Sequence, residues 1–118
     1  MIRRMPTHVG DDTVASCVVA GDYIFLAHHA AHWFGSDIVE QTRAVFESMQ
    51  NTLASVGASL NDVVQLNLYL RNIADFRQAA DVFREFFTEG APARMTTTTD
   101  FVDATCLVQM DGVAYIGA

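Results

Sequence analysis

Two short segments near the start of the chain are rich in β-branched and aromatic residues and are too short to form helices. They span residues 14–20 and 23–27. Gly21 and Asp22, which lie between them, are residues typical of tight turns. The pattern predicts a β-hairpin here, and a loop is expected at residues 30–36.

Apolar residues then recur every three or four positions, which is the spacing of one face of an α-helix. Asp37 and Glu40 have the spacing of a capping box, with Ser36 as an alternative cap. Gly57 can take the left-handed conformation that ends many helices. These signals predict a helix whose inner face consists of Ile38, Thr42, Val45, Phe46, Met49, Leu53 and Val56.

Three further strands are expected in the second half of the chain, at residues 63–70, 94–101 and 104–116. The first of them alternates between an apolar and a mixed face, as a half-buried strand does. The apolar face is predicted to consist of Val64, Leu66, Leu68 and Leu70, and the mixed face of Val63, Gln65, Asn67 and Tyr69.

A second helix is expected to begin after its cap, Asp75, and to end before Gly90 and Pro92. The predicted order is therefore β-β-α-β-α-β-β in one domain covering residues 1–118. This is an α+β fold, with one sheet that carries both helices on one face and needs covering on the other. The inner face of the second helix consists of Phe76, Ala79, Ala80, Val82, Phe83, Phe86 and Phe87.

The composition is both apolar and acidic. Of the 118 residues, 51% are hydrophobic and 18% are charged, so a partner subunit is expected to cover part of the apolar surplus. The formal net charge is -7, lysine is absent, and the seven arginines form no basic stripe. This balance argues against a nucleic-acid partner.

Nothing in the sequence indicates a membrane segment or a secretory signal. No apolar run approaches the roughly 20 residues that a membrane helix needs. The first residues include two arginines, but neither an apolar stretch nor a small-residue cleavage site follows. Cys17 and Cys106 lie far apart in apolar runs, which favours buried, reduced thiols. The sequence therefore predicts a cytoplasmic protein.

The chain resembles the Rid (reactive intermediate deaminase) family, also called the YjgF family, from about residue 14 to residue 116. Several strings occur in the order and at the spacing of that family, and the segment Pro-Ala-Arg is the most telling of them. The strings are VAGDYIF at 19–25, QTR at 41–43, GASLNDVV at 57–64, YLRNIADF at 69–76 and PARMT at 92–96.

The resemblance implies a chorismate-mutase-like fold with a mixed sheet. It also implies a homotrimer, whose small-molecule sites lie in the clefts between neighbouring subunits. The best-known activity of the family is the hydrolysis of enamines and imines, released by pyridoxal-phosphate enzymes, to 2-keto acids and ammonia. The family uses neither a metal nor an organic cofactor, so none is expected here.

Arg94 and Thr96 are the candidate substrate-binding residues at the start of a predicted strand. The resemblance assigns to Arg94 the arginine that anchors the substrate carboxylate, and a guanidinium suits this role because it can form two parallel charge-assisted hydrogen bonds. The alternative is a structural ion pair with one of the acidic residues. Thr96 stands at a site position that often holds a small thiol or hydroxyl residue, although it is also an ordinary strand threonine.

Gln109 stands where the family has its catalytic glutamate, which positions the attacking water and helps to move its proton. An amide can position water but has no useful protonation equilibrium. Asp111 lies on the same face of the predicted strand and could partly substitute for the glutamate. The alternative is that both are ordinary polar strand residues. The chain also departs from the family at Val14 and Ala80, where the family has a tyrosine and an asparagine.

Three histidines, His28, His29 and His32, and Trp33 follow the second predicted strand. Histidine exchanges protons near neutral pH, so His28 or His29 could supply the acid-base function that Gln109 lacks. A metal site is the less favoured hypothesis because the spacing has no helical HxxxH context. Packing at the surface or at an interface is the remaining alternative, and Trp33 is expected to pack at the subunit interface.

The leading hypothesis is hydrolytic deamination of a small imine or enamine carboxylate. A divergent or non-catalytic member of the family that binds a small carboxylate is the main rival. Two further hypotheses are a hydrolase of aminoacrylate-like or aminomuconate-like compounds, and a ribonuclease, which the acidic charge disfavours.

Overall fold

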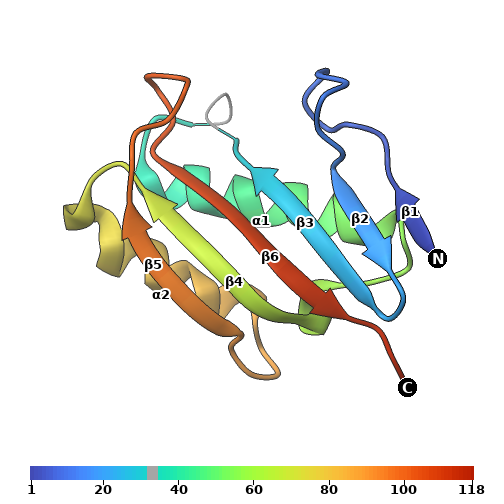
Figure 1. Ribbon diagram of the computed structural model, residues 1–118. Helices are drawn as coiled ribbons and strands as arrows, with labels where there is room; N and C mark the ends of the chain where they lie inside the picture. The colour runs from blue at the N-terminus through green and yellow to red at the C-terminus, as the bar shows by residue number, and fades with distance from the viewer. Residues whose placement is uncertain (32–34) are drawn as a thin grey trace.

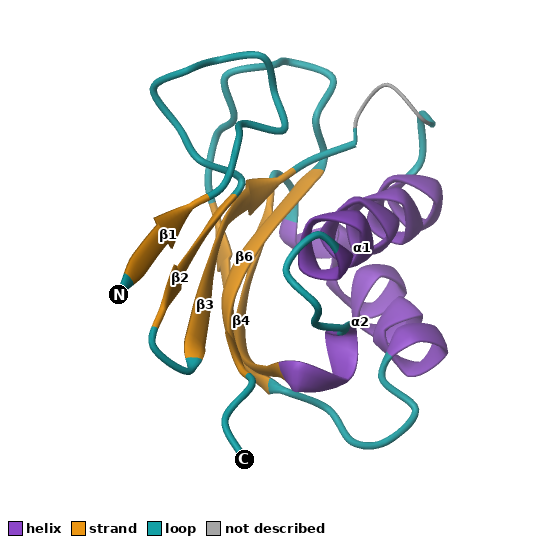
Figure 2. Cartoon of the chain, turned by 90° about the vertical axis from the view of Figure 1, so that its right-hand side faces the viewer, coloured by secondary structure: helices purple, strands orange, loops and turns teal. Residues whose placement is uncertain are grey.

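The computed structural model describes residues 1–31 and 35–118, which form a six-stranded sheet with the order β1-β2-β3-β6-β4-β5. Neighbouring strands are antiparallel except β4 and β5, which are parallel. Both long helices lie on one face of this mixed sheet (Figure 1, Figure 2). The elements are β1 (Ile2–Arg4), β2 (Cys17–Ala20), β3 (Tyr23–His29), α1 (Ile38–Ala54), η2 (Leu60–Asp62), β4 (Val63–Leu70), η3 (Ile73–Asp75), α2 (Phe76–Phe86), β5 (Ala93–Thr98) and β6 (Val108–Tyr115).

The α+β class and the placement of both helices on one face confirm the sequence prediction. Several strands differ from the prediction. The short strand β1 was not predicted and extends the hairpin by pairing with β2. In the hairpin, β2 begins at Cys17 rather than at residue 14. Near the end of the chain, β5 stops at Thr98 and β6 starts at Val108, so residues 99–107 form a connecting loop.

The two helices begin differently. The Asp37 side chain accepts a hydrogen bond of 2.8 Å from the backbone N–H of Glu40, which confirms Asp37 as the cap of α1. Asp75, the predicted cap of α2, makes no such bond. Instead, Asn72 accepts from the N–H of Ala74 at 2.9 Å and starts the 3-10 turn η3, which leads directly into α2.

The core lies between the sheet and the helices. Alternate residues of β4 and β6 point toward the helices and are fully buried. From α1, Phe46 packs edge-on against Phe83 of α2, with ring centroids 4.9 Å apart. Burying a large apolar side chain stabilises the folded state by roughly 1.5–3 kcal/mol. Both cysteines, Cys17 and Cys106, are buried free thiols, as predicted.

An irregularity in β4 overturns one predicted orientation. Val63 is buried and Val64 is 47% exposed, whereas the alternation had placed Val64 inside. The pairing of β4 with β6 shifts between Val63 and Gln65, and a bulge of this kind reverses the alternation. Gly112 of β6 permits the close approach, because a Cβ there would lie 2.5 Å from the carbonyl oxygen of Gln65.

The face of the sheet that the helices leave uncovered, here called the open face, carries large exposed side chains. Tyr23 and Phe25 of β3, Met95 of β5 and Tyr115 of β6 are all at least 38% exposed. Figure 2 shows the sheet with the helices on one side only. No described helix has the length and apolar character needed to cross a membrane.

Candidate functional site

Arg94 lies on the helix side of the edge strand β5. The parallel register pairs Arg94 with Leu66 and Thr96 with Leu68, and both leucines are buried beneath the helices. The Cζ atom of Arg94 lies 5.3 Å and 5.1 Å from the ring centroids of Phe76 and Phe83 in α2. These cation-π contacts hold the guanidinium against the helix.

The Arg94 side chain lines a cavity of about 470 Å³ between α2 and β5, here called the arginine cavity. Within residues 1–31 and 35–118, no carboxylate lies within ion-pair distance of Arg94. The structure therefore does not show the ion pair that was the alternative role for this residue. The lining residues are Arg77, Ala80, Phe83, Arg84, Ala91, Pro92 and Arg94.

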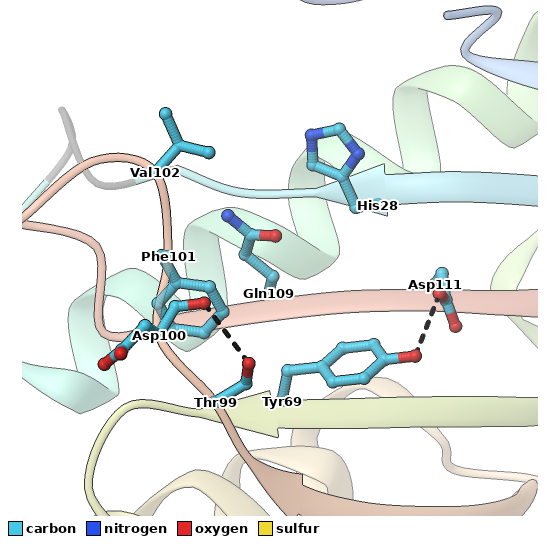
Figure 3. Close-up of a pocket in the computed structure, with 8 residues that line it drawn as sticks. All are labelled: His28, Tyr69, Thr99, Asp100, Phe101, Val102, Gln109 and Asp111. Carbon is cyan, nitrogen blue, oxygen red and sulfur yellow. Dashed lines mark hydrogen bonds between the residues drawn. The ribbon is translucent and has the colours of Figure 1, made fainter.

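A second cavity, of about 420 Å³, lies on the open face and is here called the open-face cavity (Figure 3). His28 of β3, Gln109 and Asp111 of β6 and Tyr69 of β4 contribute side chains to it. The 99–107 loop closes one end. The lining residues are His28, Tyr69, Thr99, Asp100, Phe101, Val102, Gln109 and Asp111.

Asp111 is held by two neighbours on β4. Its Oδ1 accepts a hydrogen bond of 2.8 Å from Asn67 Nδ2, and its Oδ2 accepts one of 3.2 Å from the hydroxyl of Tyr69. Burial raises the pKa of Tyr69, and the charge of Asp111 raises it further, so the phenol stays protonated and can donate. Asp111 is thus a fixed hydrogen-bond acceptor in this cavity.

Gln109 keeps its carbonyl oxygen available. Its Nε2 donates a long hydrogen bond of 3.7 Å to the Sγ of Cys106. Burial raises the pKa of the Cys106 thiol, which therefore remains protonated near neutral pH. Among the described residues no donor is bonded to Gln109 Oε1, so this oxygen can accept a hydrogen bond from water.

A bulge in β3 turns His28 onto the open face. Its register with β6 shifts between Leu26 and His29, so Ala27 and His28 together face Asp111. Burial lowers the pKa of His28, the charge of His8 lowers it further, and Asp111 opposes both effects. The ring is therefore neutral near pH 7 and can accept a proton.

His29 points to the other side of the sheet and is fully buried. Its Nδ1 lies 2.8 Å from the carbonyl oxygen of Ala27, which can only accept, so Nδ1 donates and Nε2 accepts from the Thr52 hydroxyl at 2.8 Å. Burial lowers the pKa of His29 to about 4. Both nitrogens have hydrogen-bond partners and His29 lines neither cavity, which favours the packing role over proton transfer.

The structure offers no support for a metal site in the part of the chain that it describes. No group of three or more His, Cys, Asp or Glu side chains in this part is arranged to hold an ion. His28 and His29 point to opposite faces of the sheet, whereas His32 and Trp33 lie outside the described residues.

The predicted site residues form two separate groups within one chain. Arg94 and Thr96 lie on the helix side, and His28, Gln109 and Asp111 lie on the open face. The sequence analysis did not identify the polar side chains of β4 and α2 that lie beside these residues. Alternation along residues 63–70 could have placed two polar side chains of β4 beside Asp111, and helical spacing could have placed two arginines on one face of α2. The side chains thus added are Asn67, Tyr69, Arg77 and Arg84.

The sequence matches the family model described as Endoribonuclease L-PSP over residues 14–116. A RutC family protein of Pyrococcus abyssi is 33% identical to this chain, and the aligned region covers 95% of this chain and 91% of that protein. The 3-aminoacrylate deaminase RutC of Acinetobacter baylyi is 34% identical over 68% of this chain and 64% of its own. A 2-iminobutanoate/2-iminopropanoate deaminase of Dermatophagoides farinae is 30% identical over 67% of this chain and 62% of its own.

A solved structure agrees with these matches. The crystal structure of a YjgF family member from Neisseria meningitidis superimposes with a TM-score of 0.91, covers 100% of this chain and 97% of its own, and is 24% identical. This likeness defines the class as a YjgF-type α+β fold. The chain belongs to the Endoribonuclease L-PSP family, which is the YjgF/Rid family that its sequence resembles.

Proposed function

We propose that the chain is a hydrolytic deaminase of small imine or enamine carboxylates, which it converts to 2-keto acids and ammonia. The observation that carries this proposal is Arg94, a guanidinium that faces a cavity and has no carboxylate partner in the described chain. Such a group is suited to bind a substrate carboxylate. The family relationship to two deaminases supports the same chemistry.

The site is proposed to form between subunits of a homotrimer. Arg94 lies on the helix side of its sheet, whereas His28, Gln109 and Asp111 lie on the open face, so one chain cannot bring all four to one substrate. A second copy can place its open-face cavity against Arg94 of the first. The exposed side chains of β3 on this face support the arrangement, because a partner would cover them.

In the proposed reaction, Arg94 and the hydroxyl of Thr96 hold the substrate carboxylate while water adds to the imine carbon. Gln109 Oε1 accepts a hydrogen bond from that water and orients it. His28, whose protonated form is stabilised by the charge of Asp111, takes a proton from the water and returns it to nitrogen. The C–N bond of the resulting carbinolamine then breaks. Both protons of the water leave on ammonia, and its oxygen becomes the keto oxygen.

A non-catalytic carboxylate-binding protein is the second candidate, and Gln109 favours it. The amide cannot move a proton, so the site lacks the carboxylate that assists catalysis in the family. A ribonuclease, which the name of the family suggests, fits the chain less well because its net charge of -7 repels a polyphosphate backbone.

Two measurements distinguish the enzyme from the binding protein. The first is ammonia release from freshly generated 2-iminobutanoate, corrected for spontaneous hydrolysis. The second is calorimetric titration with 2-oxobutanoate. Accelerated ammonia release identifies the enzyme. Binding of the keto acid without acceleration identifies the binding protein, and the absence of both overturns the proposed site.

A further inference from the structure

The arginine cavity holds more positive charge than one carboxylate requires. Three of the seven arginines of this acidic chain line it: Arg94 from β5, and Arg77 and Arg84 from α2. We infer that the cavity binds a ligand with two acidic groups, so that the substrate class is a 2-imino or 2-enamino dicarboxylate. This inference rests on the proposed function, because Arg94 is taken as the anchor of the first carboxylate.

The three guanidinium groups are arranged along one side of α2. Arg77 and Arg84 are seven residues apart, which is two helical turns, and therefore share a face. Arg94 lies against the rings of Phe76 and Phe83, which are also two turns apart and bracket the same stretch of helix. A guanidinium from the sheet thus lies beside two from the helix.

Arg77 and Arg94 are close enough to hold one small molecule between them. The Cζ atoms of Arg77 and Arg94 lie 5.0 Å and 5.3 Å from the centroid of the same Phe76 ring. The two Cζ atoms are therefore at most about 10 Å apart, a span that suits a short chain with a carboxylate at each end, since each carboxylate takes a few ångströms for its own hydrogen bonds.

The charge of the cavity is only partly compensated. Asp81 forms ion pairs with Arg77 at 3.5 Å and with Arg84 at 2.5 Å. One carboxylate thus pairs with two of the three guanidinium groups, and each arginine has N–H donors that these contacts do not use. The helix arginines are largely exposed, with side chains 66% and 75% accessible, so they can turn toward an incoming anion.

The rest of the lining is apolar and, except for Phe83, small. Ala80, Ala91 and Pro92 leave room between the arginines and offer no polar group that would compete for the ligand. Such a lining favours a carbon chain that joins two acidic ends.

The chemistry of the reaction is unchanged by the second acid. Water adds to the imine carbon next to the carboxylate held by Arg94, and ammonia leaves. The product is a 2-oxodicarboxylate. The second carboxylate takes no part in bond changes and serves to select the substrate through Arg77 and Arg84.

The test is calorimetric titration of the intact protein with 2-oxoglutarate and with 2-oxopentanoate, which has the same length but lacks the second carboxylate. We expect 2-oxoglutarate to bind at least about tenfold more tightly. The double variant Arg77→Gln/Arg84→Gln should lose about ten- to a hundredfold in affinity for 2-oxoglutarate and keep its affinity for 2-oxopentanoate. Arg43→Gln, which removes an arginine that pairs with Glu85 elsewhere, is the matched control and should change neither affinity.

The contrary outcomes distinguish a failure of the dicarboxylate inference from a failure of the carboxylate anchor. Equal affinity for the two keto acids in the wild type, or an equal loss for both in the double variant, overturns the dicarboxylate inference. If Arg94→Ala still abolishes binding of both compounds in that case, the proposed function stands. If Arg94→Ala changes neither affinity, or if neither keto acid binds at millimolar concentration, the carboxylate anchor itself is wrong and both proposals fail.

Discussion

The Arg94 side chain shows how one residue can be oriented for binding without being neutralised. Two aromatic rings of α2 hold the guanidinium in place through cation-π contacts. In the described chain no carboxylate pairs with its N–H donors. The donors therefore remain available for an incoming anion.

We predict that Arg94→Ala abolishes carboxylate binding while the fold is retained. The loss of a charge-assisted bidentate contact should cost roughly 2–3 kcal/mol, which is thirty- to more than a hundredfold in affinity or in kcat/KM. Calorimetry and steady-state kinetics measure this effect, and circular dichroism monitors the fold. Arg94→Lys keeps the charge but not the planar fork, so it should recover only part of the affinity. Undiminished binding in Arg94→Ala would show that the residue is structural.

The amide at Gln109 determines the rate of imine hydrolysis that we expect. We predict that the wild type hydrolyses simple 2-imino acids slowly, because acid-base assistance is worth about 10²–10⁴ in rate, Gln109 supplies none of it, and His28 replaces it only in part. Gln109→Glu has nearly the same shape and should raise kcat, as measured by ammonia release. Fast wild-type turnover would mean that His28 replaces the glutamate in full. No gain in Gln109→Glu, with Arg94 still binding carboxylates, would mean that the cleft serves another ligand.

At the scale of elements, bulges decide which side chains face the open-face cavity. The irregularity in β3 reverses the alternation after Leu26, so His28 lies on the open face and His29 on the helix side, the opposite of what a regular strand would give. His28 reaches the cavity, whereas His29 connects β3 to α1 through the hydroxyl of Thr52. The buried ring thus joins the sheet to the helix that covers it.

The buried His29 makes stability depend on pH. Its pKa in the folded state is about 4, below the value of 6.5 expected without burial. The unfolded chain therefore takes up the proton first. The stabilisation by the neutral ring is complete above pH 6.5 and is lost as the pH falls toward 4, by up to about 3 kcal/mol.

Urea unfolding at pH 7 and pH 4.5 measures this contribution. The free energy of unfolding should fall less between the two pH values in His29→Gln than in the wild type, because the carboxyl groups titrate in both proteins while the imidazole titrates in only one. An identical fall in both proteins would contradict a neutral, buried His29.

At the scale of the whole molecule, the division of the proposed site across the sheet connects the proposed oligomer with the proposed function. One chain has Arg94 on its helix side and His28 with Gln109 on its open face. The open face also exposes Phe25, which is 48% accessible in the single chain. Both features are explained if a second copy packs on this face.

We predict that the protein is a homotrimer in solution. Light scattering should give about three times the chain mass of 13.0 kDa. Phe25→Glu places a charge on the open face and should dissociate the assembly and abolish deamination together, since the shared site would be lost. A wild-type monomer at micromolar concentration would contradict the trimer and the shared site. Retained activity in a monomeric Phe25→Glu variant would contradict the shared site alone.

Apart from β1 and the two short 3-10 turns, local patterns in the sequence determined the elements and their order. Asp37 marks the start of α1 because its side chain accepts a hydrogen bond from a free backbone N–H of the first turn. Gly57 follows the end of α1 because glycine readily takes the positive φ found there. The alternation in residues 66–70 determined which face of β4 is buried, and the same period placed Gln109 and Asp111 on one face of β6. These features depend on neighbours along the chain, and so a sequence can specify them.

Only the tertiary structure decided where the chemical groups meet. The bulges that turn His28 and Val64 outward arise where two strands pair out of step, and neither strand encodes the mismatch alone. The burial of His29 depends on Thr52 from a distant helix. The gathering of three arginines at one cavity depends on α2 packing beside β5, which the pattern of either element by itself does not contain.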